Sequence, residues 1–283
     1  MADPISPALV GREYPPIDVK WEEKDVQLYA VAVGARPKTE LEFLYENKGP
    51  KVLPTYAVIP ALNIMGAAVG NIQINLAMLL HGEQKITLHR PLPAKFNGKG
   101  VAKITEVYDK GKAAVIGVTG TVSDENGLVA TTHATLFIRG AGGFGGERGP
   151  SSEETAVKIP DRAPDHVVEQ VTHEEQAALY RLTGDRNPIH IDPQFAMFGG
   201  YKEPFLHGLC TYGFAGRAIL HSLCGSDPAR FISMSGRFSD QVYMGDTIVT
   251  KIWDEGNGKA VVQVETQKGN VVLKDCRVEY KPA

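Results

Sequence analysis

The chain is poor in cysteine. Its 283 residues include three, Cys210, Cys224 and Cys276, which is an odd number without CxxC spacing. We expect reduced, packed thiols of an intracellular protein rather than a disulfide framework. The first ten residues lack a basic stretch followed by an apolar run, and the last three are not the peroxisomal Ser-Lys-Leu. These features predict a cytoplasmic protein, of bacterial origin.

The chain also lacks an excess of charge of either sign. Its formal net charge is -3, which gives no global electrostatic reason to bind nucleic acid or an anionic membrane. Hydrophobic residues make up 43% of the sequence. A chain of this length and composition is able to bury one large core or two smaller ones.

The segment 52–82 contains no Asp, Glu, Lys or Arg and would be long enough to cross a bilayer. It carries four side-chain amides and two prolines, at Asn63, Asn71, Gln73, Asn75, Pro54 and Pro60. Because amides are costly to bury in lipid, we expect no membrane span here. The segment instead predicts a core helix and a strand, with part of its surface lining an apolar cavity.

Several motifs of known chemistry are absent or incomplete. His173-Glu174 begins like HExxH, but Ala177 occupies the second ligand position, and no GxSxG string occurs. The glycines at 140, 142 and 145 match GxGxxG, yet linker composition follows instead of a helix, so nucleotide binding is not expected. The sequence predicts no metal and no cofactor. Four further histidines lack metal-ligand spacing and are expected to pack or hydrogen bond: His81, His89, His133 and His221.

The stretch RLTGDRNPIH, residues 181–190, concentrates the most chemistry in the chain. It places Asp185, Asn187 and His190 within six residues. A glycine precedes the acid and a proline follows the amide, and these two residues favour a tight non-helical bend. Asp and Asn are also common in ordinary turns, because their side chains bond nearby amides. A histidine five residues beyond the acid favours catalysis, since imidazole exchanges protons near neutral pH. A carboxylate and an imidazole sharing one water suit a lyase that adds water to a polarised double bond.

A second signal lies at Pro204-Phe-Leu-His-Gly208. It opens a segment that ends near Leu223 and has Arg217 as its single formal charge. A helix that starts here would aim free amides, including that of Gly208, toward a developing negative charge. His207 has two interpretations, as a wall of the pocket beside Gly208 or as an anchor for the start of the helix.

The chain repeats itself with a period of about 150 residues. Gly34-Ala35-Arg36 in the first half echoes Gly184-Asp185-Arg186 in the second. Each half ends on a pair of strand patterns with a turn between them: 117–123 and 131–139, then 260–267 and 271–280. A duplicated antiparallel domain explains the repeat, and two merely similar domains are the alternative. We expect domains at 1–139 and 159–283, joined by a glycine-rich linker at 140–158.

The first half lacks the chemistry of the second. Ala35 stands where the second half has Asp185, and no histidine follows at the spacing of His190. The helix start expected at residues 54–58 lacks a counterpart of the pair His207-Gly208. We therefore predict one catalytic half and one supporting half.

These residues resemble a known family. The sequence is similar to the (R)-specific enoyl-CoA hydratases, or hydratase 2, among the MaoC-like dehydratases of the hot-dog fold. The resemblance runs through most of the chain, but Met244 stands where members often have proline. It rests on these positions: Tyr180, Leu182, Thr183, Gly184, Asp185, Asn187, Pro188, Ile189, His190, Ala196, Arg237, Phe238, Val242, Tyr243, Gly245 and Asp246.

The resemblance implies an α+β double hot-dog, with two repeats that each wrap an antiparallel sheet around a long central helix. It implies that the first repeat widens an acyl pocket and that the product is a (3R)-3-hydroxyacyl-CoA. Asp185 and His190 would hold the water, Asn187 would orient it, and Gly208 would stabilise the enolate. The expected partners are an acyl-CoA substrate and a second copy in a homodimer, with no nucleic acid. Coenzyme A arrives as part of the substrate.

Two other functions remain open at this point. Hot-dog domains also house thioesterases, which hydrolyse the same class of thioester. The other alternative is a non-catalytic acyl-binding partner. Arg186 and Arg237 are candidates for either coenzyme A phosphate contacts or structural ion pairs, and the sequence does not favour one of these roles.

Overall fold

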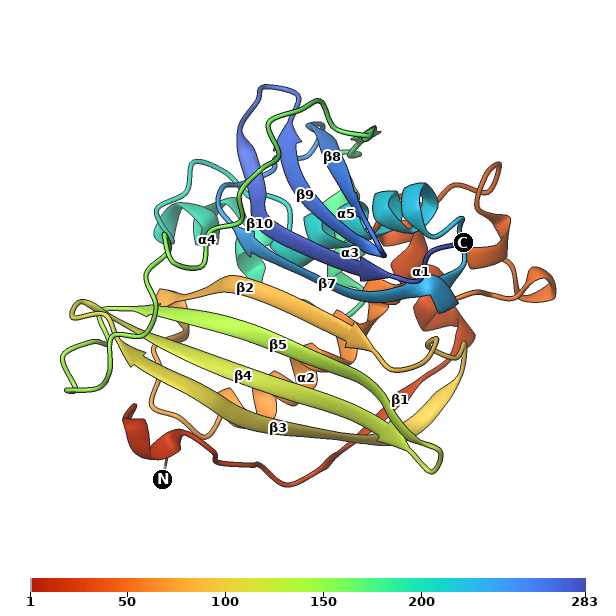
Figure 1. Cartoon of the computed structure of the whole chain (residues 1–283). Helices are drawn as coiled ribbons and strands as arrows, with labels where there is room; N and C mark the ends of the chain where they lie inside the picture. The colour runs from red at the N-terminus through yellow and green to blue at the C-terminus, as the bar shows by residue number, and fades with distance from the viewer. Residues whose placement is uncertain (1) are drawn as a thin grey trace.

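The computed structural model describes residues 2–283, and within them ten strands form one antiparallel sheet (Figure 1). The first half supplies β1 (Ile17–Trp21), α1 (Glu23–Ala32), α2 (Val58–Val69), β2 (Leu79–Leu88), β3 (Phe96–Asp109), β4 (Ala113–Asp124) and β5 (Gly127–Arg139). The second half supplies β6 (His166–Val171), α3 (Gln176–Arg181), α4 (Pro193–Phe198), α5 (Gly208–Leu223), β7 (Phe231–Phe238), β8 (Thr247–Gly256), β9 (Lys259–Thr266) and β10 (Val271–Tyr280).

The order of the strands shows the internal repeat. It runs β1-β3-β4-β5-β2 in the first half and then β7-β10-β9-β8-β6, which is the same order reversed. The two halves join where β2 pairs with β7, with Ile86 opposite Met234. Each half is thus a five-stranded antiparallel sheet packed against its own helix, which confirms the two repeats with central helices that the family resemblance implied. The two sheets are continuous rather than separate.

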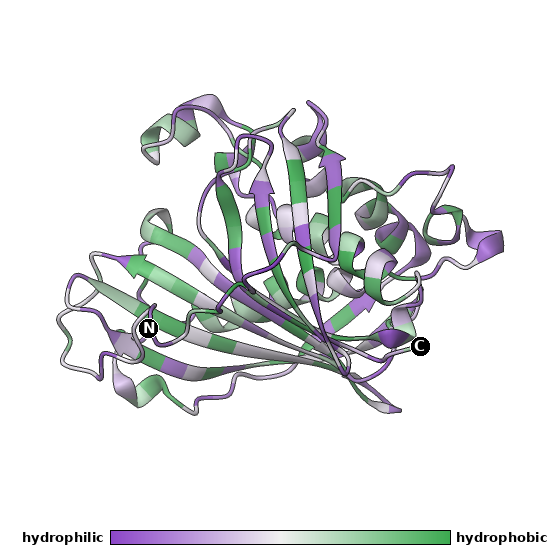
Figure 2. Cartoon of the chain, turned by 45° about the horizontal axis from the view of Figure 1, so that its top comes forward, coloured by the Kyte–Doolittle hydropathy of each residue, from purple (hydrophilic) through white to green (hydrophobic). Residues whose placement is uncertain are grey.

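The two longest helices, α2 and α5, pack against the sheet. Helix α2 lies against β3 and β4, and α5 lies against the strands of the second half (Figure 1). Most residues of α5 are buried, among them Phe214, Ile219 and Leu220, so it is a central helix rather than an amphipathic surface one. Fully burying one such side chain contributes roughly 1.5–3 kcal/mol. Along β5, buried and partly exposed residues alternate, and hydrophobic and hydrophilic residues alternate likewise in the strands of Figure 2.

The uncharged segment 52–82 forms the 3-10 turn Pro54–Ala57, helix α2 and the start of β2, which confirms the prediction of a core helix and a strand. No helix within residues 2–283 is long and apolar enough to cross a membrane.

The glycine-rich linker binds a carboxylate of its own chain. The side chain of Asp109, at the end of β3, accepts hydrogen bonds of 2.8 Å from the backbone amides of Gly111, Gly143 and Gly145. These amides lower the pKa of Asp109 to about 2. Gly143 and Gly145 have φ values of 87° and 82°, a region that glycine adopts readily. Two glycines of the linker therefore fix its path along β3.

Ion pairs made by two arginines of the second half connect it to the first half. The buried guanidinium of Arg217, on α5, lies 2.7 Å from Glu40 and also donates to the carbonyl of Val33. On the sheet, Arg237 of β7 donates to Glu83 of β2 at 2.7 Å. Arg237 thus has a structural partner in the first half. The three cysteines are buried and unpaired, as expected from the sequence.

Candidate active site

The stretch around Asp185 bends sharply after α3 ends at Arg181. Gly184 has a φ of 146°, a value that residues with a side chain rarely adopt. The carboxylate of Asp185 accepts the amide of Asn187 at 3.2 Å, and the side-chain oxygen of Asn187 accepts the amide of Ile189 at 3.2 Å. Both residues therefore stabilise the turn. The bend leads directly into the 3-10 turn Pro188–His190, which carries the imidazole.

His190 is buried, and its ring orientation is fixed. Its Nδ1 lies 2.9 Å from the backbone oxygen of Phe205, so Nδ1 carries the proton and Nε2 carries the lone pair. Burial lowers the pKa of His190, which the charge of Asp185 opposes in part. The ring is therefore neutral at neutral pH, with Nε2 as a proton acceptor.

His207 connects the two predicted catalytic residues. It is fully buried, its Nε2 lies 3.2 Å from the backbone oxygen of Asp185, and its ring centroid is 3.9 Å from that of His190. Burial, and then the neighbouring His190, lower the pKa of His207 to about 2, so it stays neutral. The side chain thus connects the Asp185 backbone to the start of α5.

Asp185, His190 and His207 each offer a ligand atom, and these atoms all lie within 4.8 Å of one another. Two imidazoles and a carboxylate are also a donor set that zinc accepts. One nitrogen of each ring faces a backbone carbonyl, and the other nitrogen of each ring has no backbone partner. The expectation that the protein binds no metal stays a prediction.

Helix α5 begins beside this cluster. Gly208 is its first residue and His207 its N-cap. The amides of Gly208 and Leu209 come before the residues whose amides make the first helical hydrogen bonds, which go to the carbonyl of His207. Free amides at the start of a helix of this length favour a negative charge. A Cβ on Gly208 would lie 3.0 Å from the ring of Phe238, so glycine permits close packing at this point.

The structure also places near the site a first-half histidine that the sequence predicted only to pack or hydrogen bond. His81, on β2, makes an edge-to-face contact with Phe238 at 5.3 Å between ring centroids, and it interacts electrostatically with Asp185. No sequence motif marks this histidine. Its proximity arises because β2 and β7 pair at the junction of the two halves.

Two family models match the chain. Residues 19–140 match the MFE-2 hydratase 2 N-terminal domain, and residues 155–275 match the MaoC-like domain. A conserved hypothetical protein of Mycobacterium tuberculosis, described as a double hot-dog, shares the fold at a TM-score of 0.59, with 14% identity over 97% of this chain and 96% of its own. Fold and family models together define the class, a MaoC-like dehydratase with a double hot-dog fold.

The chain belongs to the hydratase 2 family of these dehydratases, which are hydro-lyases. It is 44% identical to 3-hydroxyacyl-thioester dehydratase Y of Mycobacterium tuberculosis, over 98% of each chain. It is 39% identical to the probable enoyl-CoA hydratase 2 of Dictyostelium discoideum, covering 94% of this chain and 92% of that one. The crystal structure of a MaoC-like dehydratase from Phytophthora capsici superposes with a TM-score of 0.86 at 36% identity, covering 97% and 96% of the two chains.

Proposed function

We propose that this protein catalyses the reversible hydration of trans-2-enoyl-CoA to (3R)-3-hydroxyacyl-CoA in fatty acid metabolism. The observation that carries the proposal is the convergence of Asp185 and His190 at the start of α5. Family membership supports the substrate class, because the relatives are named as hydratases and dehydratases of acyl thioesters.

In the proposed reaction, the thioester carbonyl makes the β-carbon of the substrate electrophilic. Asp185 and His190 hold one water, the pair takes a proton from it as hydroxide adds, and a proton is returned to the α-carbon. The negative charge that develops on the carbonyl oxygen is stabilised by the amide of Gly208, and one such donor is typically worth about 3 kcal/mol. Asn187 fixes the turn that orients Asp185. These steps balance without a metal or redox cofactor, and coenzyme A enters with the substrate.

We propose that residues 1–139 support the acyl pocket, that residues 140–158 link the halves, and that residues 159–283 carry catalysis. We also propose that the protein forms a homodimer and that it lies in the cytoplasm. The apolar side chains of Met197 and Phe198 on α4, 62% and 82% exposed, support self-association, because exposed apolar patches commonly mark interaction surfaces. Analytical ultracentrifugation of the purified chain measures this assembly directly.

The assay that tests the activity follows the loss of enoyl absorbance of crotonyl-CoA and determines the chirality of the product. We expect hydration to the (3R) alcohol without release of free coenzyme A. Release of coenzyme A, detected with a thiol reagent, would instead identify a thioesterase. Binding of crotonyl-CoA without turnover would identify an acyl-binding protein.

The acid limb of the pH profile should reflect the neutral state of His190. Burial lowers the pKa of this imidazole from its usual 6.5, so it becomes protonated only below that value. Because the neutral ring accepts the proton, kcat/KM should stay high as the pH falls through 6.5 and should decline at lower pH. A profile of kcat/KM between pH 4 and 8 measures this, and a decline that begins above pH 7 would contradict it.

A further inference from the structure

Three side chains of the candidate active site form a set of metal ligands. Asp185, His190 and His207 each offer one ligand atom, and these atoms lie within 4.8 Å of one another. Within residues 2–283 no second group of three such side chains occurs at this spacing. Two imidazoles and one carboxylate suit Zn²⁺, which takes four ligands in tetrahedral geometry. The cluster therefore offers three ligands to one ion and leaves the fourth position for a water.

The two imidazoles have the orientation that zinc-binding histidines require. Nδ1 of His190 donates to the carbonyl of Phe205 at 2.9 Å, and Nε2 of His207 donates to the carbonyl of Asp185 at 3.2 Å. Because a carbonyl oxygen only accepts, these two nitrogens carry the protons. The lone pairs are left on Nε2 of His190 and on Nδ1 of His207. Histidines that bind metal ions almost always donate their other N–H to a carbonyl or a carboxylate, which fixes the tautomer.

His207 carries a buried nitrogen that nothing in the described part of the chain satisfies. Its side chain is 0% exposed, and its Nδ1 has no hydrogen-bond partner among residues 2–283. Its ring lies against that of His190, with 3.9 Å between the centroids and 33° between the planes. A buried acceptor without a partner is costly. The proposed reaction gives this nitrogen no role, whereas a metal ion would satisfy it.

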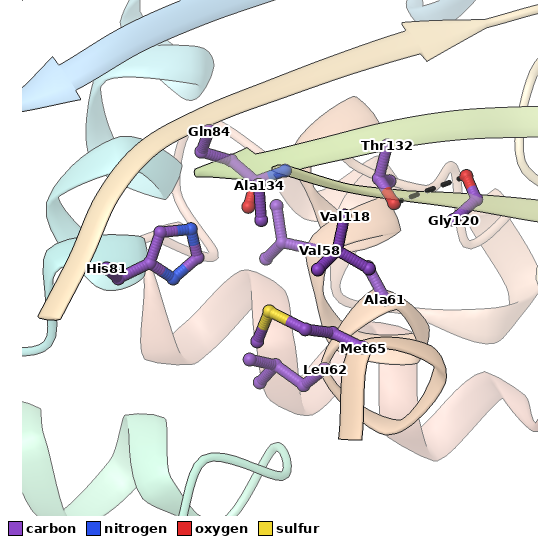
Figure 3. A pocket seen from close by; sticks show the side chains of 10 residues that line it. All are labelled: Val58, Ala61, Leu62, Met65, His81, Gln84, Val118, Gly120, Thr132 and Ala134. Carbon is purple, nitrogen blue, oxygen red and sulfur yellow. Dashed lines mark hydrogen bonds between the residues drawn. The ribbon is translucent and has the colours of Figure 1, made fainter. Parts of the chain in front are cut away.

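Asp185 is able to complete the site. Its Oδ1 accepts the amide of Asn187 at 3.2 Å, and the side chain is only partly buried. The ligand atoms around one tetrahedral Zn²⁺ lie roughly 3–4 Å apart, so a small rotation brings the carboxylate into range. His81 is not a fourth ligand. It lines the small cavity between α2 and β2 that Figure 3 shows, and no member of the cluster lines that cavity.

We propose that Asp185, His190 and His207 bind one Zn²⁺ ion, and that the ion inhibits the protein. The inhibition rests on the proposed hydratase function, because zinc takes the carboxylate and the His190 lone pair that would otherwise hold and deprotonate the water. Zinc is thus an inhibitor of the reaction and not its cofactor. This site departs from the expectation, drawn from the sequence, that the protein binds no metal. Mg²⁺ prefers oxygen ligands and should not bind here.

The first test measures metal binding in the absence of substrate. Isothermal titration calorimetry of the metal-free chain should show one Zn²⁺ per chain and no binding of Mg²⁺. His190→Gln and His207→Gln should each weaken zinc binding at least ~10-fold, because changes to the groups that merely support a ligand already cost that much. His89→Gln, which alters an exposed imidazole outside the cluster, should retain the wild-type affinity. Circular dichroism checks the fold of each variant.

The second test follows the hydration of crotonyl-CoA. Saturating Zn²⁺ should lower the rate of the wild-type chain and of His89→Gln at least ~10²-fold, as expected for loss of the proton acceptor, and EDTA should restore it. The concentration that gives half inhibition should equal the dissociation constant from calorimetry. Mg²⁺ at the same concentration should leave the rate unchanged.

The outcomes separate the two proposals. A wild-type chain that binds no zinc would overturn the site, and so would unchanged affinity in His190→Gln, even if His207→Gln fails to fold. Zinc binding without loss of rate would overturn the inhibition. Absence of hydration by the metal-free wild-type chain would instead overturn the proposed function, while the calorimetric result on the site would stand.

Discussion

Changing His190 to Gln should lower kcat for crotonyl-CoA by at least ~10²-fold, with the fold intact. In the wild-type chain the Phe205 carbonyl accepts the Nδ1–H of His190, and the glutamine amide can still donate to this carbonyl. It has no imidazole lone pair to accept a proton from water. Asp185→Asn should cost a similar factor, because the asparagine oxygen can still accept the Asn187 amide while the negative charge is lost. Steady-state kinetics with circular dichroism measures both effects.

His89→Gln is a matched control for the histidine change. His89 is exposed and contacts Thr131 at 2.9 Å, away from the cluster, so this variant should retain the wild-type kcat. If His190→Gln or Asp185→Asn hydrates crotonyl-CoA at the wild-type rate, the role that we propose for that residue is wrong.

The second large effect concerns the amide of Gly208. Proline fits the first position of a helix, where its missing N–H leaves the helical hydrogen bonds intact. Gly208→Pro should therefore remove one donor from the carbonyl oxygen while α5 is preserved. Alanine at the same position keeps the amide and adds the same Cβ, which would lie 3.0 Å from Phe238. We expect kcat of the proline variant to be about 10²–10³-fold below that of the alanine variant.

The comparison between these two variants isolates the N–H, because both must accommodate the contact with Phe238. Melting temperatures check that α5 is retained in each. Equal kcat values for the proline and alanine variants would show that the Gly208 amide does not contact the developing charge.

Local patterns predicted much of the fold. The strand pairs 117–123 with 131–139 and 260–267 with 271–280 appear as β4 with β5 and β9 with β10, although β4 and β5 are longer than predicted. Helix α5 starts at Gly208 and ends at Leu223, as the segment that opens at Pro204 and carries only Arg217 as a charge indicated. The pairing of β2 with β7 was not predicted, because either edge of each sheet has backbone groups available for pairing.

Sequence patterns predicted the local part of the site but not its contacts between distant segments. Asp185 and His190 are five residues apart, so a local bend is enough to bring them together. The contact of His207 with the Asp185 backbone depends on where α5 packs against the bend, and the pairing of Arg217 with Glu40 spans 177 residues. His81 approaches the site only through the joined sheets. Contacts that depend on tertiary packing have no characteristic residue spacing by which the sequence would reveal them.

The most direct test of a shared water is the kcat of the double variant Asp185→Asn/His190→Gln beside its two single variants. Residues that act as a unit on one molecule have non-additive effects on kcat. If each single change costs about 10²-fold, the double variant should lose little more than that. A loss near 10⁴-fold, the product of the two, would show that the residues act independently, and it would contradict the mechanism that we propose.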